Sequence, residues 1–224
     1  MVWDWPLRLW HWLLALSLGG SWLTAELGFD YREWHMRLGY WILGLLVFRL
    51  LWGLLGSRTA RFASWWPAPR ALLRYLRTLL RREAQPTATA GHSPLGGLAT
   101  WALLVMVAVQ AGTGLFTDDD ALYVGPYESA VSSAWANWLD KLHHSHFDWL
   151  LAVVGLHLTA IAFYHFYKRQ RLVRPMITGR AAVPAEQAIM TPPWWRLLLA
   201  VALAAVSIWL LLELAPEPSF DDYY

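Results

Sequence analysis

Residues 143 to 168 read HHSHFDWLLAVVGLHLTAIAFYHFYK and contain five of the eight histidines of the chain. The apolar part of this stretch, residues 147 to 167, has only three strongly polar side chains, Asp148, His157 and His165. A helix rises about 1.5 Å per residue, so a segment of this length can cross a hydrocarbon core of about 30 Å. Histidines at membrane depth are costly, and they therefore indicate a functional site.

The spacing of these histidines places imidazoles at two depths on one helix face. At about 100° per residue, His143 and His157 lie about 40° apart around the axis and about 21 Å apart along it. His146 lies near the same face, about 20° from His157, whereas His144 and His165 lie farther round. We therefore expect partners for these imidazoles on other helices.

The composition indicates a membrane protein with several spans. Of the 224 residues, 57% are hydrophobic and 17 are Trp, which is too apolar for an ordinary soluble domain. The chain has no Cys, which excludes disulfides, thiolate metal sites, iron–sulfur clusters and covalently attached c-type haem. Any metal cofactor must therefore be held by His or carboxylate side chains.

Five apolar runs predict five transmembrane helices, at about residues 7–28, 35–56, 94–116, 147–167 and 194–214. The first run is longer than the apolar core of a signal peptide and lacks a small-residue cleavage site, so we interpret it as a helix of the mature protein. The fifth run contains no histidine. We expect an all-α membrane protein, with a four-helix transmembrane domain over residues 1–180 and a linker, fifth helix and acidic tail over residues 181–224.

The loop charges predict how the helices are oriented. Residues 57–93 contain seven arginines and one acid, and basic loops stay in the cytoplasm. Five leucines of this loop recur at helical spacing and predict an amphipathic helix on the inner leaflet: Leu72, Leu73, Leu76, Leu79 and Leu80. Residues 117–142 form an acidic loop that belongs outside. The chain is therefore expected in a bacterial inner membrane, with a cytoplasmic N-terminus and a periplasmic C-terminus.

This topology brings histidines of different helices to the same depth. His11, near the cytoplasmic end of the first helix, can face His157, and His35, at the outer end of the second, can face His143. A flat macrocycle with two axial imidazoles fits each pair, whereas zinc requires further ligands or an open water position. Haem b, two groups per chain, is the predicted cofactor. With both axial positions filled, the predicted role is electron transfer.

The residues themselves leave alternatives open. His144 and His146 compete with His143, and any of these histidines can instead serve as a hydrogen-bond partner between helices. Gly39 lies one turn after His35, where a missing side chain lets a flat ligand approach the backbone.

Two further residues are candidates for binding haem propionates near the inner surface. Arg49 either binds a propionate or extends along its aliphatic stem to the cytoplasm. His92 either hydrogen-bonds a propionate or is a solvated loop histidine.

Six sequence motifs, taken together, resemble the bacterial cytochrome b561 family, which includes b-type cytochrome subunits of nickel–iron hydrogenases. They are LRLWHW, WHMRLG, FRLLWGLLGS, GHSPLGG, GLH and LVRPMITG, within about residues 5–180. The resemblance implies a four-helix bundle with two haems b, held by His11 with His157 and by His35 with His143. It also favours His143 over its neighbours, since the interval from His143 to His157 is the one that the family shows. The fifth helix departs from this pattern.

The first functional hypothesis is a transmembrane electron conduit between the quinone pool and a periplasmic redox protein, such as a c-type cytochrome or a hydrogenase. The second is a free-standing membrane oxidoreductase that acts on a small periplasmic substrate such as superoxide, with quinone. The third is a haem-free scaffold or transporter. Under the first hypothesis we expect membrane lipid, quinone and the redox protein as partners, and no nucleic acid. The acidic outer loop and tail favour a partner with a basic patch.

Overall fold

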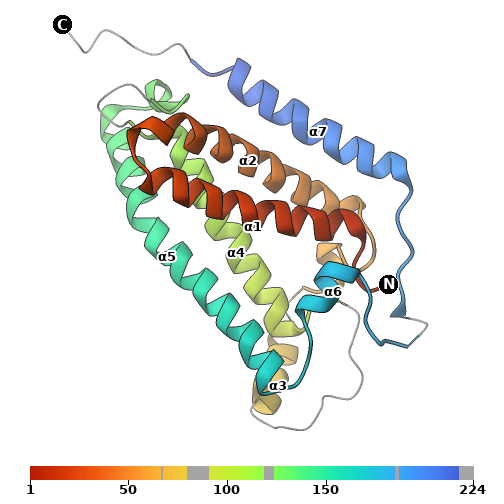
Figure 1. Cartoon of the computed structure of the whole chain (residues 1–224). Helices are drawn as coiled ribbons and strands as arrows, with labels where there is room; N and C mark the ends of the chain where they lie inside the picture. Colours follow the sequence, from red (N-terminus) through yellow and green to blue (C-terminus); the bar gives the residue numbers. More distant parts are fainter. Residues whose placement is uncertain (67, 80–90, 119–123, 185–186, 217–224) are drawn as a thin grey trace, which may run out of the picture.

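The computed structural model describes residues 1–66, 68–79, 91–118, 124–184 and 187–216, and these ranges are built from helices (Figure 1). The five long helices are α1 (Trp5–Glu26), α2 (Arg32–Leu55), α4 (Pro94–Thr113), α5 (Ser133–Phe166) and α7 (Trp194–Glu213). The shorter ones are α3 (Pro69–Leu79), α6 (Val173–Thr178) and the 3-10 turns η1 (Phe29–Tyr31), η2 (Phe62–Ser64), η3 (Gly114–Phe116) and η4 (Glu128–Ala130). The all-α prediction is confirmed.

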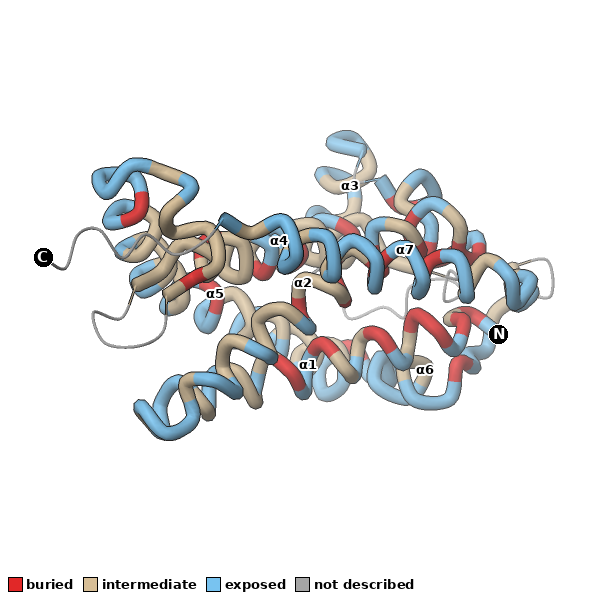
Figure 2. The backbone as a smooth tube through the Cα atoms, turned by 90° about the horizontal axis from the view of Figure 1, so that it is seen from above, coloured by how far each residue is buried: buried red, intermediate tan, exposed pale blue. Residues whose placement is uncertain are grey.

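Helix α2 is the central element of the bundle. It packs against α1, α4 and α7, while α5 packs closely against α4 (Figure 1). The buried apolar core follows this arrangement, because most of its side chains come from α1 and α2, among them Leu7, Trp10, Leu45 and Phe48. Figure 2 shows the buried positions concentrated along α1 and α2, whereas α5 is mostly partly buried or exposed. Helix α5 therefore contributes little to the apolar core.

Four described helical segments are long and apolar enough to cross a membrane: Phe29–Leu55, Pro94–Phe116, Ser133–Phe166 and Trp194–Glu213. They correspond to the second to fifth predicted spans, and their helix ends lie within a few residues of the predicted ones except at the start of α5. Helix α1 is not among the four, since it combines Arg8, His11 and Glu26 with two serines and one threonine. The protein is thus a multi-pass membrane protein, and the crossing by α1 stays a prediction.

Helix α5 begins earlier than the sequence interpretation placed it. Residues 117–142 were expected to form a loop, but α5 starts at Ser133 and η4 precedes it. The segment from Ser133 to Leu142 has no Gly or Pro and includes Ala and Leu, so nothing interrupts the helix before the histidines. At 34 residues, α5 is about 51 Å long and exceeds the thickness of a hydrocarbon core.

A buried carboxylate fixes the start of α1 against the end of α2. Asp4, with no exposed surface, caps α1 by accepting a hydrogen bond from the Leu7 backbone N–H at 2.8 Å. The indole Nε1–H of Trp52 donates to the same oxygen at 3.1 Å. A capping carboxylate at a helix N-terminus also has favourable electrostatics with the helix dipole. This contact positions His11 relative to α2.

The N-terminus is also tied to the segments that follow α5. The backbone N–H of Val2 donates to the carbonyl of Gly179 at 2.8 Å, and the N–H of Ile189 donates to the carbonyl of Met1 at 2.9 Å. The Arg8 guanidinium donates to the carbonyl of Ile177, at the end of α6. The chain start, α6 and the linker before α7 therefore form one layer at this end of the bundle.

The predicted amphipathic helix is present as α3, which ends at Leu79. The hydroxyl of Tyr75 in α3 is hydrogen-bonded to that of Tyr164, near the end of α5. This contact holds α3 at the basic end of the bundle. Parts of several predicted features lie outside the described residues, namely Leu80, Arg81, Arg82, Glu83, Asp119, Asp120 and the tail from residue 217.

Candidate functional site

The structure brings His35 and His143 together. His35 lies on α2 and His143 on α5, and their ring centroids are 6.3 Å apart with the ring planes at 89°. Two imidazoles on opposite sides of one metal ion, each at a metal–nitrogen distance of about 2 Å, would have centroids about 6 Å apart. The separation therefore suits two axial ligands of one metal ion.

The hydrogen bonds of both imidazoles fix which nitrogen is available. The Nδ1 of His35 lies 2.8 Å from the carbonyl oxygen of Ser21 on α1, and the Nδ1 of His143 lies 2.9 Å from that of Gln110 on α4. A carbonyl only accepts, so both Nδ1 atoms carry the proton. A neutral imidazole then has its lone pair on Nε2, which is therefore the nitrogen available to bind a metal. Four helices thus contribute to this pair.

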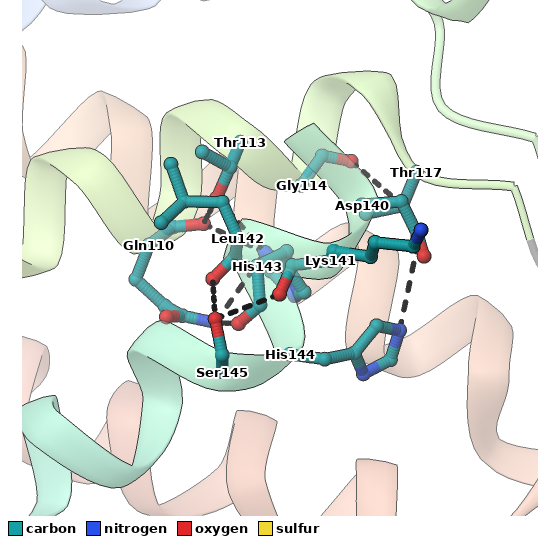
Figure 3. Close-up of polar contacts among 10 residues, drawn as sticks. All are labelled: Gln110, Thr113, Gly114, Thr117, Asp140, Lys141, Leu142, His143, His144 and Ser145. Atoms are coloured by element: carbon teal, nitrogen blue, oxygen red, sulfur yellow. Dashed lines mark hydrogen bonds and ion pairs between the residues drawn. The ribbon is translucent and has the colours of Figure 1, made fainter. Parts of the chain in front are cut away.

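Gln110 organises the histidines of α5 from the facing helix α4, as Figure 3 shows around His143. Its Nε2 donates to the backbone oxygen of His143 at 2.9 Å, and its Oε1 lies 2.9 Å from Nδ1 of His146. The Thr113 hydroxyl lies 3.2 Å from Nδ1 of His143. Neither Gln110 nor Thr113 was predicted as a site residue. A glutamine within an apolar span was the available signal.

The other two histidines of the cluster have different partners. His144 extends toward Asp140, with Nε2 3.5 Å from the carboxylate, and its side chain is 68% exposed (Figure 3). His146 is hydrogen-bonded to the Gln110 side chain. Among the three neighbours, His143 is therefore the one whose ring contacts His35.

The inner pair is looser. His11 on α1 and His157 on α5 lie within electrostatic range of each other. The Nδ1 of His11 is buried and has no hydrogen-bond partner in the structure. An imidazole nitrogen without a partner in an apolar bundle is costly unless another group satisfies it. The two residues of the predicted inner site therefore share one region and leave an unmet polar group there.

Arg49 and His92 lie together in an aromatic cluster next to this region. Arg49 is only 1% exposed, so the alternative in which it extends to the cytoplasm is wrong. Its guanidinium lies 4.5 Å from the ring centroid of Phe62, 5.5 Å from that of Trp10 and 5.8 Å from that of Trp65. Its Nε and Nη1 atoms are buried without hydrogen-bond partners. The buried carboxylate of Asp4 lies within electrostatic range of this guanidinium, and the unpaired nitrogens favour binding of a further anionic group.

His92 is not a solvated loop histidine either. Its ring centroid lies 4.4 Å from that of Trp65 and 4.9 Å from that of Trp3, and its Nδ1 is buried without a partner. Burial, and then the positive charge of Arg49, lower the pKa of His92 to about 3. His92 is therefore neutral at physiological pH and offers a hydrogen bond rather than a charge.

The described residues fit a planar group with axial imidazoles better than a metal ion held by side chains alone. No group of three or more His, Cys, Asp or Glu side chains that could hold a metal ion occurs within them. The histidines come in pairs instead. A Cβ atom added at Gly39 or at Gly155 would meet no atom within 4 Å, so both helices have open space beside these glycines.

Gly114 lies close to the ring of His143, and this close approach gives a prediction with a matched control. A Cβ atom at Gly114 would lie 3.0 Å from Cε1 of His143, whereas one at Gly112 would meet nothing within 4 Å. We expect Gly114→Ala to displace the His143 ring and to weaken retention of the group bound there roughly two- to tenfold, as overpacking costs about 1 kcal/mol or more. Gly112→Ala should leave retention unchanged. Haem retained per chain during detergent washing measures both, and equal retention would contradict the contact.

The comparisons with known proteins agree on one family. The model of the family described as prokaryotic cytochrome b561 matches residues 2–179. Two relatives, each named probable Ni/Fe-hydrogenase B-type cytochrome subunit, come from Azotobacter chroococcum mcd 1 and Azotobacter vinelandii. Each is 27% identical over 217 residues, which cover 80% of this chain and 86% of the relative.

A third relative is more distant. The probable Ni/Fe-hydrogenase 1 B-type cytochrome subunit of Escherichia coli (strain K12) is 25% identical over 138 residues, covering 50% of this chain and 57% of the relative. No solved structure matches the chain significantly. Because the family model covers most of the chain, the protein belongs to the prokaryotic cytochrome b561 family, a membrane cytochrome that transfers electrons through haem b.

Proposed function

We propose that this protein carries two haems b, one near each membrane surface, and conducts electrons across the membrane between the quinone pool and a periplasmic redox protein. The observation that carries the proposal is the contact between His35 and His143, with both Nδ1 protons donated to backbone carbonyls. His11 and His157 form the second site. Haem supplies one-electron chemistry when it is bound, and two histidine ligands leave no position for a substrate at iron.

The residues around the two sites have separate tasks. Ser21 and Gln110 hold the outer imidazoles in the tautomer that binds metal. Arg49 and His92 offer partners for propionates at the inner site, where the buried atoms of both residues are unpaired. In this proposal α1 crosses the membrane with the other helices, since it packs along α2 and carries His11.

The names of the relatives suggest the redox partner. The Azotobacter and Escherichia coli proteins are named as subunits of nickel–iron hydrogenases, so we propose a hydrogenase-like protein as partner, with a c-type cytochrome as the alternative. Quinone is the proposed exchange partner in the membrane. Copurification from the native membrane distinguishes the two candidates. The true partner would remain bound under mild detergent and could be identified as a hydrogenase-like protein or a c-type cytochrome.

Electron transfer across a liposome membrane tests the proposed function directly. Purified haem-loaded protein is reconstituted without quinone into liposomes that contain ferricyanide, and the impermeant reductant dithionite is added outside. We expect the trapped ferricyanide to be reduced by the wild-type protein far faster than in protein-free liposomes, because a conduit must connect both surfaces. His144→Ala serves as a control variant and should retain the wild-type rate of ferricyanide reduction. A wild-type rate equal to that of empty liposomes would refute the conduit.

A further inference from the structure

A basic pocket lies where α2 ends and α7 begins, on a part of the molecule that the haem sites do not use. Its volume is about 450 Å³, and three arginines line it, Arg58, Arg61 and Arg196. The remaining walls come from residues 56–57 and from the linker, residues 188–193. The described lining residues include no acid. The linker and α7 lie beyond residues 2–179, which match the family model.

Two of the three arginines are held in place by the backbone around them. Nη1 of Arg196 donates to the carbonyl of Leu55, the last residue of α2, at 3.3 Å, and Nη2 of Arg58 donates to the carbonyl of Gln187 at 3.1 Å. The Nε of Arg196 is buried without a hydrogen-bond partner. The linker wall is fixed as well, since Ile189 is buried and bonded to the chain start. Arg58, Arg196 and the linker wall are thus held by contacts within the chain.

Three guanidinium groups around one pocket favour a phosphate group as the ligand. Arginine binds phosphate through several charge-assisted hydrogen bonds, and its weak hydration makes it well suited to sites at interfaces. A phosphate oxygen would satisfy the Nε of Arg196, which is buried without a hydrogen-bond partner.

The position of the pocket indicates where the phosphate comes from. It lies at the ends of two apolar spans, α2 and α7, which is the depth of lipid headgroups. Large apolar side chains next to it are exposed, with Leu54 at 69%, Trp195 at 50% and Leu199 at 41%. Acyl chains can lie along these side chains while the headgroup occupies the pocket. Basic pockets between membrane helices on the cytoplasmic side are typical sites for anionic headgroups.

We propose that this pocket binds the headgroup phosphate of an anionic phospholipid, which joins α7 to the end of α2 through the three arginines. The proposal does not depend on haem or on electron transfer. Native mass spectrometry of the haem-loaded protein in detergent tests it, with phosphatidylglycerol, with phosphatidylcholine of the same acyl chains, and with millimolar inorganic phosphate as competitor. We expect phosphatidylglycerol to bind about tenfold or more tightly than phosphatidylcholine, and inorganic phosphate not to displace it.

Charge variants locate the binding. Arg61→Gln should weaken phosphatidylglycerol binding by about tenfold, and Arg61→Gln with Arg196→Gln should weaken it further. Arg77→Gln on α3 makes the same charge change at an exposed position and should have no effect. An unchanged haem spectrum shows that each variant is folded, and Arg61→Lys should recover part of the affinity. Equal binding of both lipids, displacement by inorganic phosphate, or an equal loss in Arg77→Gln would overturn the proposal.

Discussion

The His35→Ala and His143→Ala variants are each expected to retain half of the haem of the wild-type protein, because each loses one axial nitrogen of the same group. The 6.3 Å separation of the two rings places both side chains at one site. Combining the two substitutions should cost no more haem than either alone, as expected for residues that act on one ligand. Combining His35→Ala with His11→Ala should remove both haems. Pyridine haemochrome analysis counts haem per chain in each variant.

The neighbouring histidines provide the control for this assignment. His144→Ala should keep both haems, since His144 is mostly exposed and pairs with Asp140. His146→Ala should also keep both, because Nδ1 of His146 is hydrogen-bonded to the Gln110 side chain. Redox titration then assigns the remaining haem, and His11→Ala and His157→Ala should leave the same one. A loss of haem in His144→Ala but not in His143→Ala would show that the ligand is misassigned.

Arg49→Gln is expected to lower the midpoint potential of the inner haem by an amount on the order of 50–100 mV. Arg49 is buried, its guanidinium lies 5.5 Å from the ring centroid of Trp10, the residue before His11, and two of its nitrogens lack partners. For a positive charge on the order of 10 Å from a bound haem, at an effective dielectric constant of about 20, Coulomb's law gives somewhat less than 2 kcal/mol in favour of the oxidised state when the charge is removed. The sign follows because the ferric form carries the additional positive charge. Potentiometric titration followed in the haem absorption bands measures the shift.

A charge change elsewhere on the same helix controls for this effect. Arg37 lies on α2, with its side chain 61% exposed and paired with Glu33. Arg37→Gln removes the same charge and should leave the inner potential almost unchanged, since exposed charges are screened by solvent and salt. Arg49→Lys keeps the charge and should shift the potential much less than Arg49→Gln. Equal shifts in Arg49→Gln and Arg37→Gln would show that the effect is not local.

The apolar pattern of the sequence predicted the helices well but not where α5 begins. Apolar runs mark the membrane-embedded part of a helix, and Ser133–Leu142 continues α5 with polar and aromatic residues that give no such signal. The contacts of Asp4 could not be predicted either. An aspartate just before Trp5-Pro6 is a local signal for a helix cap. Its hydrogen bond with Trp52, however, joins residues 48 positions apart, and no local pattern predicts it.

The candidate site was predictable to a similar extent. Loop charges and helix positions placed His35 at the same depth as His143 and its neighbours, and the family resemblance favoured His143 among them. In the structure the ring of His35 lies 6.3 Å from that of His143. The burial of the Arg49 side chain was not predictable, because an arginine near a helix end reaches the surface in some proteins and is buried in others. Its burial depends on Phe62 and Trp65, which a turn after α2 returns to the helix. The spacing of residues along a helix does not predict where the chain turns back after the helix ends.

The attachment of the N-terminus has a consequence for biosynthesis. Val2 and Met1 bond to Gly179 and Ile189, so residues 1 and 2 receive these partners from segments made more than 170 positions later. The start of α1 must therefore remain without these contacts while α2, α4 and α5 are inserted. This end of the bundle is therefore completed only after these helices are inserted, once the linker before α7 has been made. Premature termination before residue 179 would leave Met1 and Val2 without these two backbone partners, while Asp4 could still bond to Trp52 at the end of α2.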